Sequence, residues 1–357
     1  MAETEGGRRL SGRRQFLAGL VVLPIGLAGC TFLNSESASP TTAADAKSFP
    51  VSVTHAFGTT VINSEPKRIA TLGLGSNDIC LALGVVPVAM PLSRAQPNGS
   101  TPWFDSAFRP FGLESPLLLD EEKGLPVDDL TGMGPDLILA VHSSLTRSEY
   151  EELSKIAPVV AYPDGPMATD WRTSLALVGT ALGRTDVAAT VLAETETSIR
   201  SELGNYPDLA GTEFLVTRVR AALGADFEVF GENSNPVRIL QEFGLDPSPS
   251  LRLVKESGRL VNPAANGAET YAWPAGRAAE LGSDIAVFSV IHDEAPAIKS
   301  GGLLDPVPAH KTGNFILADS NGDGLALDTA SCLSVRWLSR SMVPELARAA
   351  YGAKRGG

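Results

Sequence analysis

The sequence predicts an α/β protein with two α/β lobes, whose mainly parallel sheets are joined by one long backbone helix. Short apolar segments typical of strands alternate with helical segments up to residue 184, and the alternation restarts after residue 204. Such alternation is typical of parallel sheets. Between the two halves, residues 185–204 consist mostly of strong helix formers, and a helix of that length spans about 30 Å. We therefore predict a first lobe over 49–184, an interlobe helix over 185–204 and a second lobe over 205–357.

The elements of the first lobe follow from its hydrophobic pattern. Residues 49–64 alternate apolar and polar side chains around Gly58, which predicts a β-hairpin. Segment 76–84 is apolar at helical spacing, with Ser76 or Asn77 as the expected N-cap and Gly84 as the stop. The other expected strands are 67–73, 85–90, 135–143 and 158–163, and the other expected helices are 126–134, 148–157 and 170–184.

The second lobe repeats the pattern. Its expected strands are 212–221, 227–231, 283–293 and 313–319, and its expected helices are 235–244 and 334–352. Ligands of parallel sheets lie beyond the carboxyl ends of the strands. Two lobes that face each other would therefore form one ligand cleft.

The first thirty residues carry an export signal and do not belong to the fold. An apolar stretch from Phe16 to Leu27 follows a basic start and is too short to span a bilayer usefully. Arg13 and Arg14 resemble the pair of a twin-arginine export signal. The sequence LAGC resembles a bacterial lipobox, which implies cleavage before Cys30 and lipidation of that residue. An ordinary signal peptide that happens to contain a cysteine is the alternative.

We therefore expect a signal peptide over 1–29 and a flexible tether over 30–48. The tether is rich in Ser, Thr and Ala and too polar to bury a core. Several acyl chains together hold a protein firmly on a membrane surface. The sequence thus predicts an extracytoplasmic protein that is anchored to the cell membrane by lipid at Cys30 without spanning it.

Charge and cysteine content limit the partners. The formal net charge is −12, and removal of 1–29, with four Arg and two Glu, brings it near −14. Nucleic acid is disfavoured as a partner because its phosphates require a basic surface. With Cys30 lipidated, Cys80 and Cys332 remain; we expect a buried thiol at Cys80, with a disulfide between the two as the alternative. No cysteine or histidine spacing suggests a metal site.

A glycine-rich turn after the first buried strand raises the question of a nucleotide. GLGSND at 73–78 lacks the third glycine of the dinucleotide-binding fingerprint, and no acidic ribose ligand follows a second strand. We therefore expect this turn, with Gly73, Leu74, Gly75, Ser76 and Asn77, to line a ligand cleft. Its glycines would let the backbone approach a bulky ligand closely.

The chain resembles the iron-siderophore binding proteins of bacterial ABC importers, a periplasmic-binding-protein class with a rigid interlobe helix. The resemblance covers most of 49–352 and rests on the order and spacing of several segments. These are VTHAFGTTVI with PKRI (53–69), LALGVVPV (81–88), PDLIL (135–139), the segment from Trp171 to Arg184, and LSVRWLSRSMVPELA (333–347). The family implies capture of a ferric siderophore in a shallow, preformed cleft, delivery to an ABC permease, no cofactor, no enzymatic activity and a monomer.

Several side chains are candidates for ligand contact. His142 and His292 each follow a buried strand, so both should lie near the cleft, where they could contact the ligand or ligate heme iron. Arg218 and Arg220 are two residues apart on one expected strand, so we expect one strand face to carry both. The resemblance places there an arginine that contacts an anionic ferric siderophore. The alternatives are structural histidines and surface ion pairs.

Aromatic residues are further candidates. Trp103, which we expect in a loop, Tyr271 and Trp273 are expected to line the cleft. An aromatic residue often follows the first glycine of the turn in this family, but here it is Leu74. That difference removes a stacking surface and leaves the type of ligand open.

The resemblance also implies one carboxylate on each lobe that pairs with arginines of the permease. Asp128, with its neighbour Asp129, stands at the first position, and Glu280 lies near the second, where Gly276 occupies the expected place. A heme or cobalamin binding protein of the same importer class is the alternative function. A lipid-anchored hydrolase is a more distant one, since no pairing of a nucleophile with a base is visible.

Overall fold

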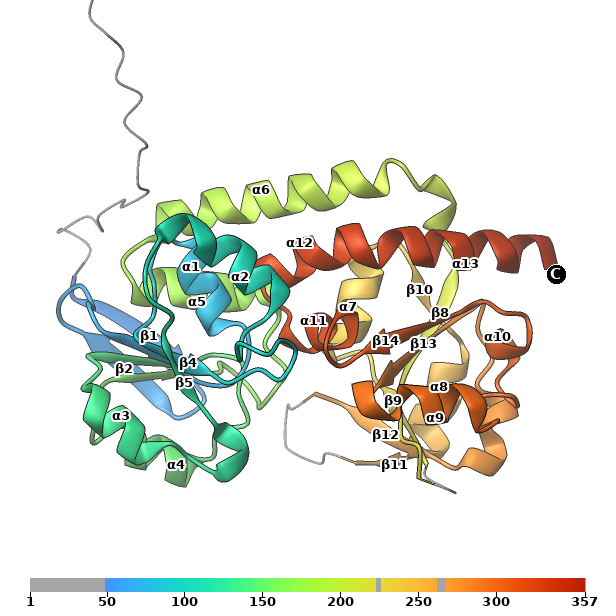
Figure 1. Cartoon of the computed structure of the whole chain (residues 1–357), viewed down its shortest axis with the longest axis horizontal. Helices are drawn as coiled ribbons and strands as arrows, with labels where there is room; N and C mark the ends of the chain where they lie inside the picture. The colour runs from blue at the N-terminus through green and yellow to red at the C-terminus, as the bar shows by residue number, and fades with distance from the viewer. Residues whose placement is uncertain (1–48, 223–225, 262–267, 357) are drawn as a thin grey trace, which may run out of the picture. The chain divides into compact units, whose positions relative to one another are not determined.

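The computed structural model describes residues 49–222, 226–261 and 268–356. The predicted signal peptide, the tether and Cys30 lie outside the described residues. The structure confirms the predicted fold class. Each half of the chain forms an α/β lobe around one large sheet, and a long helix lies between the two halves in sequence (Figure 1). Among the described residues, no helix is long and apolar enough to cross a membrane.

The first lobe contains the predicted hairpin and a sheet of five parallel strands. The hairpin pairs β1 (Val51–His55) with β2 (Gly58–Ile62). The sheet has the order β5-β4-β3-β6-β7. Its strands are β3 (Ile69–Thr71), β4 (Ala89–Pro91), β5 (Leu117–Leu119), β6 (Leu137–Ala140) and β7 (Val159–Ala161). The helices of this half are α1 (Ser76–Ala82), α2 (Pro102–Phe108), α3 (Val127–Met133), α4 (Arg147–Leu153) and α5 (Trp171–Ala181).

The second sheet is mixed, with three parallel strands at one side. β8 (Glu213–Val219), β13 (Ile285–Val290) and β14 (Phe315–Asp319) are parallel neighbours. β9 (Phe227–Phe230), β12 (Thr270–Trp273) and β11 (Arg259–Leu260) extend the sheet by antiparallel pairing, and the short β10 (Asp246–Pro247) pairs with β8. The helices are α7 (Asn235–Glu242), α8 (Ser250–Ser257), α9 (Ala295–Ser300), α10 (Pro308–Lys311), α11 (Asp323–Thr329), α12 (Cys332–Ser341) and α13 (Val343–Gly356).

The long helix α6 (Thr185–Leu203) packs through one face, as its pattern of small and apolar residues predicts. Its buried residues, Ala188, Val191, Thr195 and Ile199, recur every three or four positions and therefore lie on one side. This face contacts α5 of the first half and α12 of the second half of the chain. In Figure 1, α6 runs beside α12 along the edge that both lobes share.

One hydrophobic core continues through both lobes. It includes Ile69 and Leu137 from the first sheet and Phe214 and Ile285 from the second, joined by buried side chains of α1, α5, α6, α7 and α12. Helix α12 belongs to the second half by sequence, yet it also contacts α1, α2 and α5. The lobes therefore cannot separate without exposing apolar surface of this common core.

Three local predictions were wrong. Residues 334–352, expected as one helix, are divided between α12 and α13, because Pro344 cannot donate to the carbonyl of Arg340. Residues 102–108 form helix α2, where the Thr101 side chain accepts from the Phe104 N–H as the N-cap, instead of a loop. The N-cap of α1 is Gly75 in a left-handed conformation, not Ser76 or Asn77.

The shared core predicts cooperative unfolding of both lobes. Leu338 on α12 is completely buried, so Leu338→Ala should lower the free energy of unfolding by about 2–5 kcal/mol. Arg340→Ala, at an exposed position of the same helix, should change it by less than about 0.5 kcal/mol. Denaturant titration followed by tryptophan fluorescence and far-UV circular dichroism measures both. A second transition that Leu338→Ala leaves in place would show that the lobes unfold separately.

Candidate functional site

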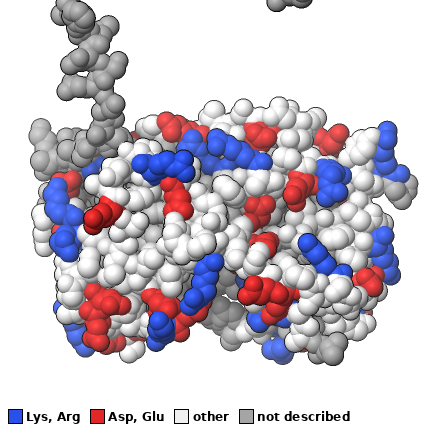
Figure 2. Space-filling model, viewed as in Figure 1, with Lys and Arg blue, Asp and Glu red and all other residues white. Residues whose placement is uncertain are grey.

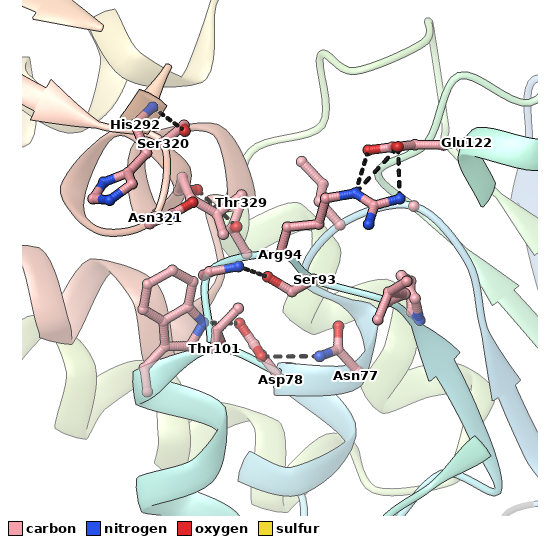
Figure 3. Close-up of a pocket in the computed structure, with 18 of the residues that line it drawn as sticks. Asn77, Asp78, Ser93, Arg94, Thr101, Glu122, His292, Ser320, Asn321 and Thr329 are labelled. Atoms are coloured by element: carbon pink, nitrogen blue, oxygen red, sulfur yellow. Dashed lines mark hydrogen bonds and ion pairs between the residues drawn. The ribbon is translucent and has the colours of Figure 1, made fainter. Parts of the chain in front are cut away.

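A cleft lies where the strands of both sheets end. Its larger hollow, about 620 Å³, is lined by segments that follow β3, β4, β13 and β14. Figure 3 shows His292 and Ser320 on the opposite side of this hollow from Glu122, with Asp78 below them in this view. A second hollow of about 340 Å³ is lined by Arg218 and its neighbours. Leu74 lines both, so the predicted turn lies at the centre of the cleft.

The glycines of the turn allow close packing against protein backbone, Gly73 within the first lobe and Gly75 against the second half of the chain. Gly73 and Gly75 have φ angles of 71° and 76°, which favour glycine. A Cβ on Gly75 would lie 2.9 Å from the carbonyl oxygen of Thr329, and a Cβ on Gly73 would collide with the carbonyl oxygen of His142. The glycines thus let the turn approach protein backbone. Close approach of this turn to a ligand stays a prediction.

Asp78 is a buried carboxyl group at the base of the larger hollow and is 1% exposed. Its Oδ2 accepts hydrogen bonds from Trp103 Nε1 (2.7 Å) and Ser331 Oγ (2.6 Å), and its Oδ1 accepts from Asn77 Nδ2 (3.2 Å). Ser331 is the N-cap of α12, so this carboxyl group connects the first lobe to the shared helix. Burial raises the pKa of Asp78 to about 7, and the hydrogen bonds from Ser331 and Trp103 oppose that rise.

The other predicted residues of the turn and its aromatic neighbour differ in their access to the hollow. Leu74 and Asn77 line it. Ser76 is completely buried and lines none of the described hollows. Trp103 also lines the larger hollow, but only 4% of it is exposed, because its ring packs near Trp337 and its N–H is bound to Asp78.

The two predicted histidines lie in different hollows. His142 lines the smaller one and is 2% exposed; its Nε2 lies 3.0 Å from the carbonyl oxygen of Asp328 and therefore donates to it. Burial lowers the pKa of His142 to about 4, so the ring is neutral, and its Nδ1 is buried without a hydrogen-bond partner among the described residues. His292 lines the larger hollow, and its Nδ1 lies 2.6 Å from Asp319 Oδ2, whose carboxylate raises the pKa of His292.

The two predicted arginines also separate. Arg218 lines the smaller hollow, but its guanidinium already binds Glu228 (3.2 Å) and Asp328 (3.3 Å) and lies over the Phe230 ring. Arg220 comes just after β8 ends, pairs with Glu294 and lines neither hollow of the cleft. The strand alternation from which we predicted a common face stops one residue before Arg220.

Tyr271 and Trp273 face the core of the second lobe. Trp273 is completely buried, and its Nε1 donates to the carbonyl oxygen of Arg277. Tyr271 is 6% exposed, and its hydroxyl donates to Glu269. The two side chains are two residues apart on β12 and therefore lie on the same face, where both pack into the core of the second lobe and lack the exposed surface needed for a ligand. The prediction that they line the cleft was wrong.

The predicted docking carboxylates lie on the surface, away from the hollows of the cleft. Asp128 and Asp129 are exposed in the first turn of α3. Glu280 is exposed at the end of the 3₁₀ segment Ala275–Glu280 and pairs with Arg277 at 2.7 Å.

The segment that follows β4 was not predicted as part of the site. Ser93 and Arg94 line the larger hollow, and Arg94 Nη2 lies 2.8 Å from Glu122 Oε2. Glu121, the residue before Glu122, accepts a hydrogen bond from the Gly73 N–H at 3.0 Å and so helps to hold the turn. The rule that sites lie at the carboxyl ends of parallel strands could have identified this segment, because β4 was expected from the sequence.

The free thiols are buried as expected for Cys80. Cys80 and Cys332 are both unpaired and completely buried. Burial, followed by the nearby carboxyl group of Asp78, raises the pKa of each thiol. Asp78 therefore lies close to both cysteines, one on α1 and the other at the start of α12.

The fold and the cleft define a bilobed binding protein. The chain belongs to the periplasmic binding protein family, whose sequence model matches residues 69–247. A curated relative, the probable siderophore-binding lipoprotein YfiY of Bacillus subtilis (strain 168), is 28% identical over 239 residues. That match covers 62% of this chain and 65% of YfiY, so the chain spans slightly less than two thirds of the relative.

Solved structures show the same architecture. PiaA of Streptococcus pneumoniae TIGR4, an iron uptake ABC transporter substrate-binding protein, is 27% identical with a TM-score of 0.71, and the alignment covers 85% of this chain and 100% of that one. Its complex with ferrichrome gives a TM-score of 0.72 with 85% and 99% covered. Staphylococcus aureus SirA, solved with staphyloferrin B, is 20% identical with a TM-score of 0.64, covers 83% of this chain and 98% of its own, and supports the fold alone.

The buried Asp78 predicts a specific pH dependence of stability. The folded protein keeps the proton on Asp78 up to about pH 7, whereas the unfolded chain releases it near 3.8. This group's contribution to the free energy of unfolding therefore falls as pH rises between these values. Asp78→Asn cannot ionise, so its stability relative to the wild type should rise by about 2–4 kcal/mol from pH 4 to pH 7.

Urea titrations across that range measure the difference. Glu151→Gln removes an exposed carboxyl group on α4 and should show no comparable rise. A constant difference between Asp78→Asn and the wild type at all pH values would contradict a buried carboxyl group that becomes charged near neutral pH.

Proposed function

We propose that this protein is the extracytoplasmic solute-binding component of an ABC importer and that it captures a ferric siderophore. The observation that carries the proposal is the position of the cleft. Segments that follow the carboxyl ends of parallel strands in both sheets line its larger hollow. Its two hollows, about 620 and 340 Å³, suit a bulky chelate. The name of YfiY and the ferrichrome complex of PiaA support iron chelates as the ligand class.

Heme or cobalamin is the second candidate ligand. His292 favours it, because its Nδ1 is bound to Asp319, an arrangement that orients the other ring nitrogen toward a metal. His142 does not supply a second ligand: its Nε2 donates to Asp328 and its Nδ1 is buried. Heme held by both histidines is therefore disfavoured.

A hydrolase has less support. Ser143 lies next to His142 in sequence, but its hydroxyl donates to the carbonyl oxygen of Ala140 at 2.9 Å. The one available histidine of the larger hollow, His292, has its Nδ1 bound to Asp319, and Ser320 accepts from the backbone N–H of His292. We infer that binding, without catalysis, is the activity.

The proposed partners follow from the surface and the amino-terminal signal. The permease would contact Asp128 and Asp129 on the first lobe and Glu280 on the second, and the lipid on Cys30 would hold the protein at the membrane as a monomer. Figure 2 shows acidic and basic side chains interspersed over one face of the molecule. With a net charge of −12, this mixed surface does not favour nucleic acid.

Ligand titration tests the binding function. Ferric siderophores should bind the purified protein with a micromolar or lower dissociation constant. They should also quench its tryptophan fluorescence, because Trp103 lies in the wall of the cleft. Heme, cobalamin and iron-free siderophores serve as controls. Binding of heme or cobalamin alone would overturn the siderophore assignment, and turnover of an ester without any binding would favour the hydrolase.

Transport in cells separates anchoring from docking. Asp128→Ala with Asp129→Ala should retain chelate affinity and lipidation but reduce uptake of ⁵⁵Fe at least about fivefold, because the permease contact is lost. Glu151→Ala with Glu152→Ala, on exposed positions of α4 in the same lobe, is the matched control. Cys30→Ser should lose labelling by radioactive palmitate. Normal uptake by the first double variant would remove the docking role, and persistent labelling would remove the lipid anchor.

A further inference from the structure

The charges of the cleft differ from those expected for an anionic ligand. Five carboxyl groups line the two hollows, against two guanidinium groups, in the described part of the chain. The carboxyl groups belong to Asp78, Glu122, Glu228, Asp293 and Asp328, and the guanidinium groups to Arg94 and Arg218. The segments 223–225 and 262–267 carry no ionisable side chain in the sequence. Burial raises the pKa of Asp78 to about 7, so this group is uncharged below that pH, and the other four carboxylates still outnumber the two guanidinium groups. An anion entering this cleft would therefore meet a net negative wall.

Both guanidinium groups already have carboxylate partners. Arg218 binds two carboxylates, Glu228 and Asp328, on opposite sides of its guanidinium, through Nη1 and Nη2. Arg94 donates from Nε and Nη2 to Glu122 and lies 3.6 Å from Asp120. An anionic ligand would have to displace these carboxylates, and each displaced carboxylate would remain close to the ligand's own charge.

The other cations around the cleft do not change this balance. Arg238 lines a neighbouring hollow together with Asp164 and donates to the carbonyl oxygen of Ala168 at 2.6 Å. His292 is paired with Asp319, so its charge when protonated is matched by that carboxylate. His292 is thus paired, and Arg238 lines neither of the two hollows, so neither group adds an unpaired cation to their walls.

The walls also lack surfaces on which aromatic rings of a ligand could stack. Of the benzene or indole rings on the described residues, only Trp103 and Phe230 line the two hollows. Each is 4% exposed, and the guanidinium of Arg218 covers Phe230 at 4.9 Å from the ring centroid. At the centre stands Leu74, an aliphatic side chain, with Leu92, Ile291 and Leu325 also on the walls of the larger hollow.

We propose that the cleft selects ferric chelates by charge: it takes an uncharged or cationic ferric trihydroxamate and excludes a trianionic ferric tris-catecholate. This inference rests on the proposed function and makes its ligand class specific. A trihydroxamate presents its iron-binding oxygens as a compact, neutral group that needs hydrogen-bond donors and aliphatic contact. Asn77, Ser93 and Asn321 supply polar groups in the larger hollow, and Leu74 supplies the aliphatic contact. A tris-catecholate would need free cations and stacking rings, which this cleft does not offer.

The test compares three probes that differ in charge: ferrichrome, which is uncharged, ferrioxamine B, which is monocationic, and ferric enterobactin, which is trianionic. Dissociation constants are measured by fluorescence and isothermal titration calorimetry at two salt concentrations. We expect ferrichrome or ferrioxamine B to bind at least about 100-fold more tightly than ferric enterobactin. Equal or tighter binding of ferric enterobactin would overturn the proposal.

Substitution of Glu228 and Asp328 tests whether their carboxylates cause the selection by charge. Glu228→Gln with Asp328→Asn keeps the shape of the side chains and releases Arg218, so affinity for ferric enterobactin should rise at least about tenfold, while that for the trihydroxamates changes less than about threefold. Glu294→Gln releases Arg220 outside the cleft and should change neither. An unchanged ratio in the double variant, with far-UV circular dichroism showing the native fold, would overturn the electrostatic cause.

The outcomes also separate this inference from the function on which it rests. If all three ferric chelates bind without an order by charge, the proposed function stands and the charge selection is wrong. If none of them binds but heme or cobalamin does, both are wrong.

Discussion

The common hydrophobic core is the constraint on which the rest of this structure depends. Apolar side chains from both sheets meet through α1, α5, α6, α7 and α12 without a break. In a protein whose lobes had separate cores, ligand binding could close a hinge at little cost. Here a large opening would expose part of the core to water, so we expect the cleft to keep nearly the same shape with and without a ligand.

A preformed cleft has to recognise its ligand through side chains that are already in place. The two ion pairs of Arg218, which is partly buried, hold that side chain before any ligand arrives, and Arg94 pairs with Glu122 at the exposed rim. The turn at 73–75 is fixed in the same way, since Glu121 holds its backbone on one side and Thr329 lies against Gly75 on the other. Preorganisation of this kind lowers the entropy lost on binding and makes the charge of the wall a stable property.

The fold could be read from the sequence because it depends on repeated local patterns. The alternation of strands and helices and the run of helix formers at 185–204 predict the architecture that the structure shows. The details of the cleft depend on contacts between distant residues, which local patterns do not reveal. Glu228 and Asp328 neutralise Arg218 from positions 10 and 110 residues away. The buried position of Trp103 depends on its hydrogen bond to Asp78. The need for glycine at position 75 comes from the carbonyl oxygen of Thr329, which lies far away in the sequence.

The reactivity of the two buried thiols, Cys80 and Cys332, depends on how often the protein opens around them. Proteins of this family work outside the cytoplasm, where exposed thiols oxidise or form mixed disulfides. Cys80 and Cys332 lie at the junction of α1 and α12, completely buried, so an oxidant or an alkylating reagent can reach them only when these helices come apart. The rate at which the native protein reacts with such a reagent therefore reports how often the two halves separate, without any engineered label.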